Sequence, residues 1–323
     1  MNFKEKNVLV TGAAGFIGSN LTIELVNLGA NVIGFDNLFN GRIENIEEIL
    51  ENKSFKFIKG DIRDFNFLLE VFEGIDIIYH VAAFTSVPQS VLMPESCNDV
   101  NVNGTLNVLN AARKRDIEKI IYSSSSSVYG DTPTLPKKED MPRHPISPYG
   151  VSKLACEGYM QVFHKIYGLR TLSLRYFNVF GPRQKDSPYS GVIAIWLGRL
   201  LNNKDLIIFG NGEQSRDFTY VKDVVHANLL AAEQGISGEI INIGAGAPIT
   251  LSNLAKLMLK LTKKEKLNIS YTDTRSGDIF HSYADISKAK ELLNFQPKFN
   301  QEEGLKDYFN WYCHKYKVSL DLN

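Results

Sequence analysis

The chain has 323 residues, 44% of them hydrophobic and 22% charged, and its 36 basic residues balance its 36 acidic ones. Such a composition is typical of a folded protein with a large core, and the length predicts two domains or one elaborated domain. Because neither charge is in excess, we expect neither nucleic acid nor an anionic membrane as a partner.

The cysteines and the N-terminal residues bear on the location of the protein. Cys97, Cys156 and Cys313 are scattered along the chain, and none belongs to a Cys-x-x-Cys pair. This spacing favours a reducing cytoplasm and argues against a structural metal site. The N-terminal residues lack an apolar signal core, and the sequence has no run of about 18 apolar residues. We therefore expect a cytoplasmic protein that is neither secreted nor inserted into a membrane.

The first 36 residues predict a strand, a glycine-rich turn, a helix and a second strand. Residues 7–10 are apolar, residues 11–18 are rich in glycine, and apolar residues at helical spacing then lead to Gly29. The second strand, residues 31–35, ends at Asp36. In such a unit, glycines let main-chain N–H groups approach a pyrophosphate, and the acid accepts hydrogen bonds from a ribose. We predict an NAD(P) site here; a purely structural turn is the alternative.

Strands and helices keep alternating through the first half of the chain. Apolar runs at 55–59, 75–80 and 119–122 each end in small or polar residues. Repeated strand–helix units predict an α/β fold with a doubly wound parallel sheet, which binds its ligand at the carboxyl ends of the strands. Asp61 lies at such an end, where it is either a ligand-binding residue or a helix N-cap. Asn101, early in the following helix, is likewise either functional or a helix cap.

Tyr149 and Lys153 have the spacing of a proton-transfer pair. Ser147 and Pro148 predict the start of a helix that extends to about Tyr167, so residues 149 and 153 share one face of it. A lysine ammonium in that position favours the phenolate of a tyrosine, whose pKa is ordinarily about 10. A hydroxyl from the serine run 123–127 can then share the substrate proton. Chance spacing on a solvated helix is the alternative interpretation of the pair alone.

After a strand at 170–175 the alternation becomes irregular, which predicts a smaller C-terminal portion packed directly on the sheet. Pockets favour such junctions. The predicted helices of this portion are residues 192–201, 251–261 and 301–316, and its predicted strands are 206–209 and 239–243.

Taken in order, the motifs of the chain resemble those of an extended short-chain dehydrogenase/reductase of the nucleotide-sugar epimerase type. The resemblance is closest to UDP-N-acetylglucosamine and UDP-glucose 4-epimerases. It implies a Rossmann NAD-binding domain over residues 1–177, joined by about 211–245, and a nucleotide-sugar-binding portion over 178–323. It also implies a homodimer built from the helices after Asn101 and Tyr149. The motifs are residues 11–18, 36–38, 60–61, 80–83, 123–130, 147–153, 175–181, 216–218 and 275–278.

The resemblance implies a role for each matched residue. Tyr149 takes a proton from a sugar hydroxyl while hydride passes to NAD, Lys153 also binds the nicotinamide ribose, and Ser125 or Ser126 shares the proton. Asp36 favours NAD, because a carboxylate repels the 2′-phosphate of NADP. The implied cofactor-binding residues are Gly12, Gly15, Phe16, Ile17, Gly18, Asp36, Asn37, Asp61, Ile62, Ala82, Ala83, Asn101, Tyr149, Lys153 and Tyr176. The implied substrate-binding residues are Ser86, Ser125, Ser126, Tyr149, Asn178, Arg216, Arg275, Asp278 and Ser282.

The serine run also bears on the reaction. Family members that resemble dehydratases carry an Asp-Glu pair where this chain has Ser126 and Ser127, because elimination of water needs an additional acid and base. The chain therefore fits reversible epimerisation at C4 of a UDP-hexose. A net nucleotide-sugar oxidoreductase is an alternative, and a non-enzymatic NAD(P) sensor is disfavoured by the intact Tyr149 and Lys153.

Ser282 bears on the choice of sugar. In family members that resemble narrow UDP-galactose epimerases this position holds a tyrosine, which leaves no room for a 2-acetamido group. A serine leaves that space, so we predict UDP-GlcNAc and UDP-GalNAc as substrates, with UDP-glucose and UDP-galactose as further or alternative ones.

Overall fold

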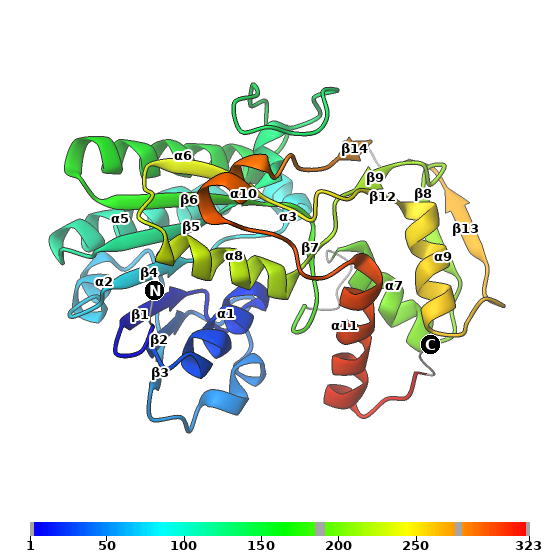
Figure 1. Ribbon diagram of the computed structural model, residues 1–323, viewed down its shortest axis with the longest axis horizontal. Coiled ribbons are helices and arrows are strands. Elements are labelled where there is room, and N and C mark those ends of the chain that lie inside the picture. The colour runs from blue at the N-terminus through cyan, green and yellow to red at the C-terminus, as the bar shows by residue number, and fades with distance from the viewer. Residues whose placement is uncertain (1–2, 185–190, 275–279, 321–323) are drawn as a thin grey trace.

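The computed structural model describes residues 3–184, 191–274 and 280–320. Its centre is a seven-stranded parallel sheet with the order β11-β6-β5-β4-β1-β2-β3 (Figure 1). The order reverses between β1 and β4, which opens a crevice at the carboxyl ends of the strands. The strands are β1 (Asn7–Thr11), β2 (Asn31–Asp36), β3 (Phe55–Lys59), β4 (Ile77–His80), β5 (Lys119–Ser125), β6 (Arg170–Tyr176) and β11 (Glu239–Ile243). The doubly wound α/β fold predicted from the sequence is confirmed.

Helices cover both faces of this sheet. Along β1, Val8 and Val10 belong to one apolar cluster and Leu9 to another, because successive side chains of a strand point to opposite faces. The first cluster lies under α1 (Phe16–Asn27), α8 (Val221–Glu233) and α10 (Ser287–Leu293). The second lies under α2 (Phe65–Val71), α5 (Gly104–Lys114) and α6 (Pro148–Tyr167).

The helix that carries Tyr149 has well-defined ends. The Ser147 side chain accepts a hydrogen bond from the main-chain N–H of Gly150 at 3.1 Å, and Pro148 occupies the first helical position, where its missing N–H costs nothing. At the other end Gly168 adopts a left-handed conformation with φ 72°. These two ends fix the whole of α6, and therefore Tyr149 in its first turn, against the sheet.

The C-terminal portion forms a third apolar cluster around the buried Trp196. Phe16 and Ile17, at the start of α1, pack against this cluster, so the two parts of the molecule are in direct contact. Its helices are α7 (Val192–Leu201), α9 (Leu251–Leu261) and α11 (Gln301–Tyr316). Its strands are β7 (Val179–Phe180), β8 (Leu206–Phe209), β9 (Ser215–Arg216), β10 (Thr219–Tyr220), β12 (Ile249–Thr250), β13 (Ile269–Thr272) and β14 (His281–Ser282).

Two local expectations differ from the structure. The strand expected to stop at residue 122 continues as β5 to Ser125, so three serines belong to the sheet. Asn101 lies in a π-helical turn, Asp99–Asn103, and the regular helix α5 begins only at Gly104. The short helices α3 (Val87–Leu92) and α4 (Pro94–Asn98) precede that turn.

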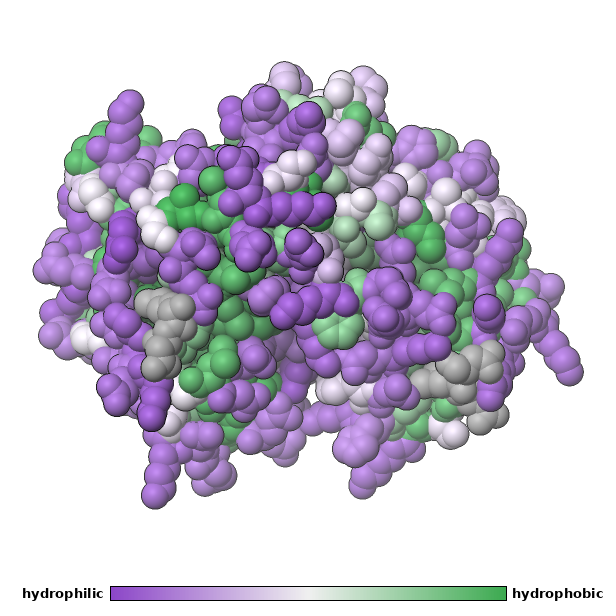
Figure 2. All heavy atoms as spheres, viewed as in Figure 1, coloured by the Kyte–Doolittle hydropathy of each residue, from purple (hydrophilic) through white to green (hydrophobic). Residues whose placement is uncertain are grey.

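Hydrophilic side chains cover most of the face seen in Figure 2, with apolar groups showing between them. None of the helices in the three described ranges is long and apolar enough to span a bilayer. The same ranges contain no cluster of three or more His, Cys, Asp or Glu side chains that could hold a metal ion. The domain boundaries remain a prediction, although β11 brings residues 239–243 back to the central sheet.

Candidate active site

Tyr149, Lys153 and Ser125 meet at the carboxyl end of β5. The Lys153 ammonium lies 5.8 Å from the centre of the Tyr149 ring and donates a hydrogen bond to the main-chain oxygen of Ser123 at 2.7 Å. The Ser125 side chain lies beside that of Tyr149, where it lowers the pKa of the phenol, and it donates a hydrogen bond to the Ser127 hydroxyl at 3.0 Å. The structure therefore brings together a phenol, an ammonium and a hydroxyl, which are the groups needed to move one proton.

Burial opposes the charged forms of both members of this pair. It raises the pKa of Tyr149 to about 12, while Ser125 acts in the opposite direction. It lowers the pKa of Lys153 to about 8, against the negative potential of Cys156 and Glu157. Burial therefore outweighs the effect of Ser125 on the pKa of the phenol. A further positive charge near Tyr149 is needed to favour its anion.

The first three serines of the run belong to β5, and the hydroxyls of the first two are engaged in the core. The Ser123 hydroxyl is 3.1 Å from the hydroxyl of Tyr176, and Ser124 donates to a carboxylate oxygen of Glu157 at 2.5 Å. Ser125, on the next position of β5, reaches Tyr149. Of the two candidates left open by the sequence, Ser125 has the contact, whereas Ser126 begins a 3-10 turn.

The glycine turn between β1 and α1 leaves no room for side chains. Gly12 has φ 71°, and a Cβ atom on it would lie 2.8 Å from the main-chain nitrogen of Ala82. A Cβ atom on Gly18 would lie 2.0 Å from the oxygen of Gly12. The turn is thus packed closely against residues 81–83 and the first turn of α1. Main-chain N–H groups at the start of a helix form a cradle that suits a pyrophosphate.

Asp36 ends β2 beside this turn. One of its carboxylate oxygens accepts from the N–H of Leu38 at 2.8 Å and the other from the N–H of Ala14 at 3.0 Å. Each oxygen retains a lone pair that a ribose hydroxyl could use. Nearby, Asn37 donates to Asp61 at 2.9 Å, and the Arg63 guanidinium holds the pKa of that carboxyl well below its usual range.

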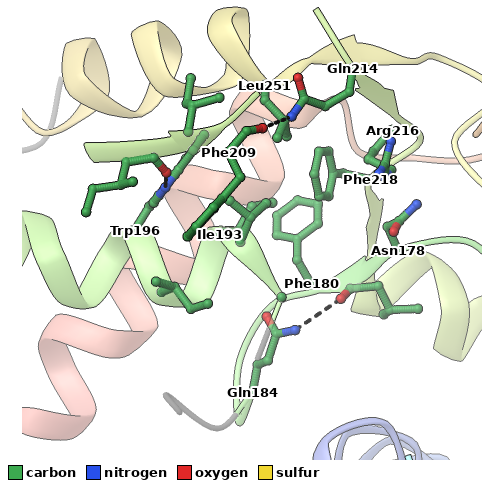
Figure 3. A pocket seen from close by; sticks show the side chains of 16 residues that line it. Asn178, Phe180, Gln184, Ile193, Trp196, Phe209, Gln214, Arg216, Phe218 and Leu251 are labelled. Atoms are coloured by element: carbon green, nitrogen blue, oxygen red, sulfur yellow. Dashed lines mark hydrogen bonds between the residues drawn. The ribbon is translucent and has the colours of Figure 1, made fainter. Parts of the chain in front are cut away.

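A separate pocket lies in the C-terminal portion, between β7, β8 and α7. Figure 3 shows Asn178 and Arg216 on the same wall of it, next to the rings of Phe180 and Phe218. Arg216 donates to the main-chain oxygens of Ser215 at 2.9 Å and Phe280 at 3.0 Å, which holds the guanidinium in place. An arginine beside a set of aromatic and aliphatic walls fits an anionic group attached to a flat ring. The other residues that line this pocket include Gln184, Ile193, Trp196, Phe209, Gln214 and Leu251.

Ser282 lies next to this arginine in the short strand β14. Ser282 is the register partner of Arg216 in the parallel pair of β14 with β9, and it is 8% exposed. The two remaining predicted substrate-binding residues, Arg275 and Asp278, lie outside the described residues.

The comparisons with known proteins agree with this geometry. Residues 8–244 match the model of the "NAD dependent epimerase/dehydratase family". The chain belongs to this family. A putative UDP-glucose 4-epimerase of Methanocaldococcus jannaschii is 40% identical over 306 residues, which cover 94% of this chain and 97% of that one.

Two solved structures resemble this family member over nearly their full length. The UDP-N-acetylglucosamine 4-epimerase of Methanobrevibacter ruminantium, solved with UDP-N-acetylmuramic acid, has a TM-score of 0.92 and 39% identity, covering 97% of this chain and 99% of that one. The UDP-glucose 4-epimerase of Thermotoga maritima, solved with UDP-glucose, has a TM-score of 0.91 and 39% identity, covering 96% and 99%. These likenesses extend beyond the family match into the C-terminal portion.

NAD is the cofactor of this family, and the residues present fit it. The turn is packed so closely that a Cβ atom on Gly12 or Gly18 would meet main-chain atoms, and the Asp36 carboxylate accepts from the N–H of Ala14 within it. Residues predicted to hold the cofactor therefore converge on one end of the sheet. Which of them contact it stays a prediction, because the geometry alone does not test each contact.

Three predicted residues have side chains that are already engaged elsewhere. The Asn101 amide accepts from the N–H of Phe84 at 2.7 Å and donates to Ser152 at 2.8 Å, so it connects the loop after β4 to α6. Tyr176 points into the core, which leaves only its main chain for the predicted contact with NAD. Ser86 caps α3 through the N–H of Gln89 at 3.3 Å.

Sequence analysis missed the residues that support Tyr149 from behind. The Ser90 hydroxyl accepts from the main-chain N–H of Tyr149 at 3.2 Å, and Glu157 receives both Ser124 and the Arg175 guanidinium. Neither Ser90 nor Glu157 belongs to a local sequence motif. Only their position, one or two helical turns from the pair or on the neighbouring short helix α3, could have indicated them.

Proposed function

We propose that this family member catalyses reversible C4 epimerisation of UDP-hexoses, and that it accepts the 2-acetamido sugars UDP-GlcNAc and UDP-GalNAc. The observation that carries the proposal is the meeting of Tyr149 with the Lys153 ammonium and the Ser125 hydroxyl at the same end of the sheet as the glycine turn. The relatives named as UDP-sugar 4-epimerases support the choice of reaction.

In this mechanism the residues of the chain handle one proton. Tyr149 accepts it from the C4 hydroxyl of the sugar, and Ser125, beside the same phenol, steadies the reacting oxygen. Lys153 stays charged and in place through its hydrogen bond to the oxygen of Ser123. NAD, when bound, would supply the positive charge that favours the phenolate and would accept the C4 hydride and give it back to the opposite face of the ketosugar. Tyr149 returns the proton to the C4 oxygen, so the exchange would need no net oxidation.

The carboxylates near the site argue against dehydration. Elimination of water needs an acid and a base in addition to the tyrosine. Glu157 is the carboxylate nearest to the serine run along α6, and its two oxygens are occupied by Arg175, at 2.7 and 2.8 Å, and by Ser124. Fully buried and paired in this way, Glu157 is committed to structure.

The small side chain of Ser282 supports the acetamido substrates, because a tyrosine at this position leaves no room for a 2-acetamido group. Ser282 is the register partner of Arg216, the arginine predicted to bind the diphosphate, so it lies near the expected position of the sugar. UDP-glucose and UDP-galactose fit the same space and are the second candidate pair. The relatives bear both kinds of name.

One assay with four UDP-sugars tests the proposal. We expect purified protein to convert UDP-GlcNAc to UDP-GalNAc, seen by chromatography, and Ser282→Tyr to lose about tenfold or more on the acetylated pair only. Ser282→Ala is the matched control, since it keeps the space. Exchange of UDP-glucose with UDP-galactose alone would remove the acetamido assignment, and an unchanged ratio in Ser282→Tyr would remove Ser282 as its determinant. Stoichiometric release of NADH would instead indicate a net oxidoreductase.

We further propose that the protein acts as a homodimer through α6. Val151, Tyr159, Val162 and Ile166 are exposed on this helix at spacings of three, four and eight, so they lie on one face. Apolar residues gathered on one exposed helix face are typical of an interface. We expect sedimentation velocity to give twice the mass of the chain.

A further inference from the structure

Arg183 joins the substrate pocket to the glycine turn. It lies in the connection between β7 and α7, and its guanidinium donates three hydrogen bonds. They go to the main-chain oxygen of Asn45 at 2.9 Å, to the side-chain oxygen of Asn20 at 3.0 Å and to a carboxylate oxygen of Glu48 at 2.9 Å. All three acceptors belong to the part of the chain that builds the glycine turn and its surroundings.

The acceptors are themselves bound to that turn. The Asn45 side chain donates to the oxygen of Ala14 at 2.8 Å, and the N–H of Arg42 donates to the same oxygen at 2.9 Å. Ala14 in turn donates its N–H to Asp36. A Cβ atom on Gly41 would lie 2.9 Å from both oxygens of Asp36. The segment 41–48 therefore lies against the carboxylate predicted to bind the adenosine ribose.

On its other side, Arg183 adjoins the pocket. Its neighbour Gln184 lines the pocket and donates to the main-chain oxygen of Val179 at 3.2 Å. The oxygen of Pro182 accepts a hydrogen bond at 2.9 Å from Asn20, whose amide also donates to the oxygen of Phe16 at the start of α1. One corner of the chain thus connects a pocket wall to the first turn of α1, and Figure 1 shows it descending from β7 towards α1.

The backbone at this corner is held in an unfavourable conformation. Arg183 has φ 69°, in the left-handed region that is unfavourable for a residue with a Cβ atom. Such a conformation persists only where the surroundings over-determine it. Its side chain is 13% exposed and lies 5.9 Å from the centre of the Trp311 ring on α11. The three hydrogen bonds of the guanidinium hold the residue in this backbone conformation.

We propose that Arg183 is a positioning residue that clamps the segment 41–48 and α1 to the substrate pocket, and so retains the cofactor between catalytic half-steps. The inference rests on the proposed function, because an epimerase returns the hydride it has removed and must not release its reduced cofactor in between. It goes beyond that function by assigning retention to a residue that touches neither reacting group.

Release of NADH tests the clamp in the absence of any UDP-sugar. Protein loaded with NADH is mixed with excess NAD, and the loss of bound-NADH fluorescence gives the release rate. We expect Arg183→Met to speed release by about tenfold or more, since it removes three hydrogen bonds made by a charged donor. Arg183→Lys should lie between Arg183→Met and the wild type, because an ammonium cannot satisfy all three directions. Glu48→Gln, which weakens one bond to a 58% exposed side chain, should speed release by about two- to threefold.

Two further variants distinguish the effect of losing the guanidinium from the effects of backbone strain and of losing a positive charge. Asparagine tolerates positive φ, so Arg183→Asn removes the guanidinium with less strain and should release NADH as fast as Arg183→Met. Arg170→Met is the matched control: Arg170 is an exposed arginine at the start of β6 that donates to the oxygen of Glu118 at 3.0 Å, and its variant should keep the wild-type rate.

Three results would overturn the clamp. The first is a release rate within about twofold of wild type in Arg183→Met and Arg183→Asn with unchanged melting temperatures. The second is an equal acceleration in Arg170→Met. The third combines two results: neither Arg183→Met nor Arg183→Asn folds, and Glu48→Gln releases NADH at the wild-type rate. This outcome would mean that Arg183 supports only the fold. Since no sugar is present, failure of the proposed epimerisation would leave these rates interpretable.

Discussion

The proton-transfer corner and the nucleotide pocket are built in different ways. Tyr149, Lys153 and Ser125 belong to a twenty-residue helix and a seven-residue strand, and their positions follow from the periods of those two elements. Asn178 and Arg216 belong to the ends of two-residue strands and to loops, and only long-range contacts bring them to one wall. The residues of the first region can therefore be predicted from the local sequence, whereas the positions of those in the second depend on the whole fold.

Removal of the phenol is the strongest test of this contrast. Tyr149→Phe keeps the ring and the helix but removes the proton acceptor, so we expect turnover to fall by about 10²- to 10⁴-fold while binding of the UDP-sugar persists. Steady-state rates and titration calorimetry measure the two quantities. Tyr167→Phe is the matched control, because Tyr167 is an exposed tyrosine at the other end of the same helix. Near-normal turnover of Tyr149→Phe would refute the assignment of the base.

The fixed geometry of the corner also depends on a fully buried ion pair. Arg175 and Glu157 are both 0% exposed, and Glu157 orients Ser124 on the strand that presents Ser125. Arg175→Met leaves a buried carboxylate without its partner, which costs about 3–5 kcal/mol of unfolding free energy. Lys288→Met is the control, since it breaks a half-exposed pair with Glu239 and costs about 0–1 kcal/mol. Urea denaturation compares them, and equal costs would show that the buried pair does not hold the corner.

The two regions also mark how far the sequence could predict this molecule. The α/β fold, the glycine turn with Asp36, and the helix that begins at Pro148 each have a local signal, and the structure has these elements. No local sequence signal decides between Ser125 and Ser126, because the choice depends on the residue at which β5 ends. The engaged amide of Asn101 and the three bonds of Arg183 were equally hidden. Arg183 reaches partners 135 to 163 residues away in the sequence, and no period or motif encodes such a contact.

The smallest expected effect is the pH dependence that the corner gives to stability. Burial lowers the pKa of Lys153 to about 8, below the ordinary value of 10.5 for a lysine. Between these values the unfolded chain holds more protons than the folded one, so the free energy of unfolding rises with pH. Below about pH 8 the lysine is charged in both states and its full desolvation cost is present. The sign is therefore opposite to that of a lysine stabilised by a salt bridge.

Lys119 is also buried with a pKa of about 8, so it makes the free energy of unfolding depend on pH in the same direction. Comparing the wild type with Lys153→Met isolates the contribution of Lys153. Lys153→Met retains Lys119 and the rest of the chain. We expect the wild type to gain up to about 1.4 kcal/mol per pH unit over Lys153→Met between pH 8 and 10. Urea denaturation of the NAD-free proteins at four pH values measures this slope. Parallel curves would mean that Lys153 titrates as an ordinary lysine, and that its ammonium is not desolvated beneath Tyr149.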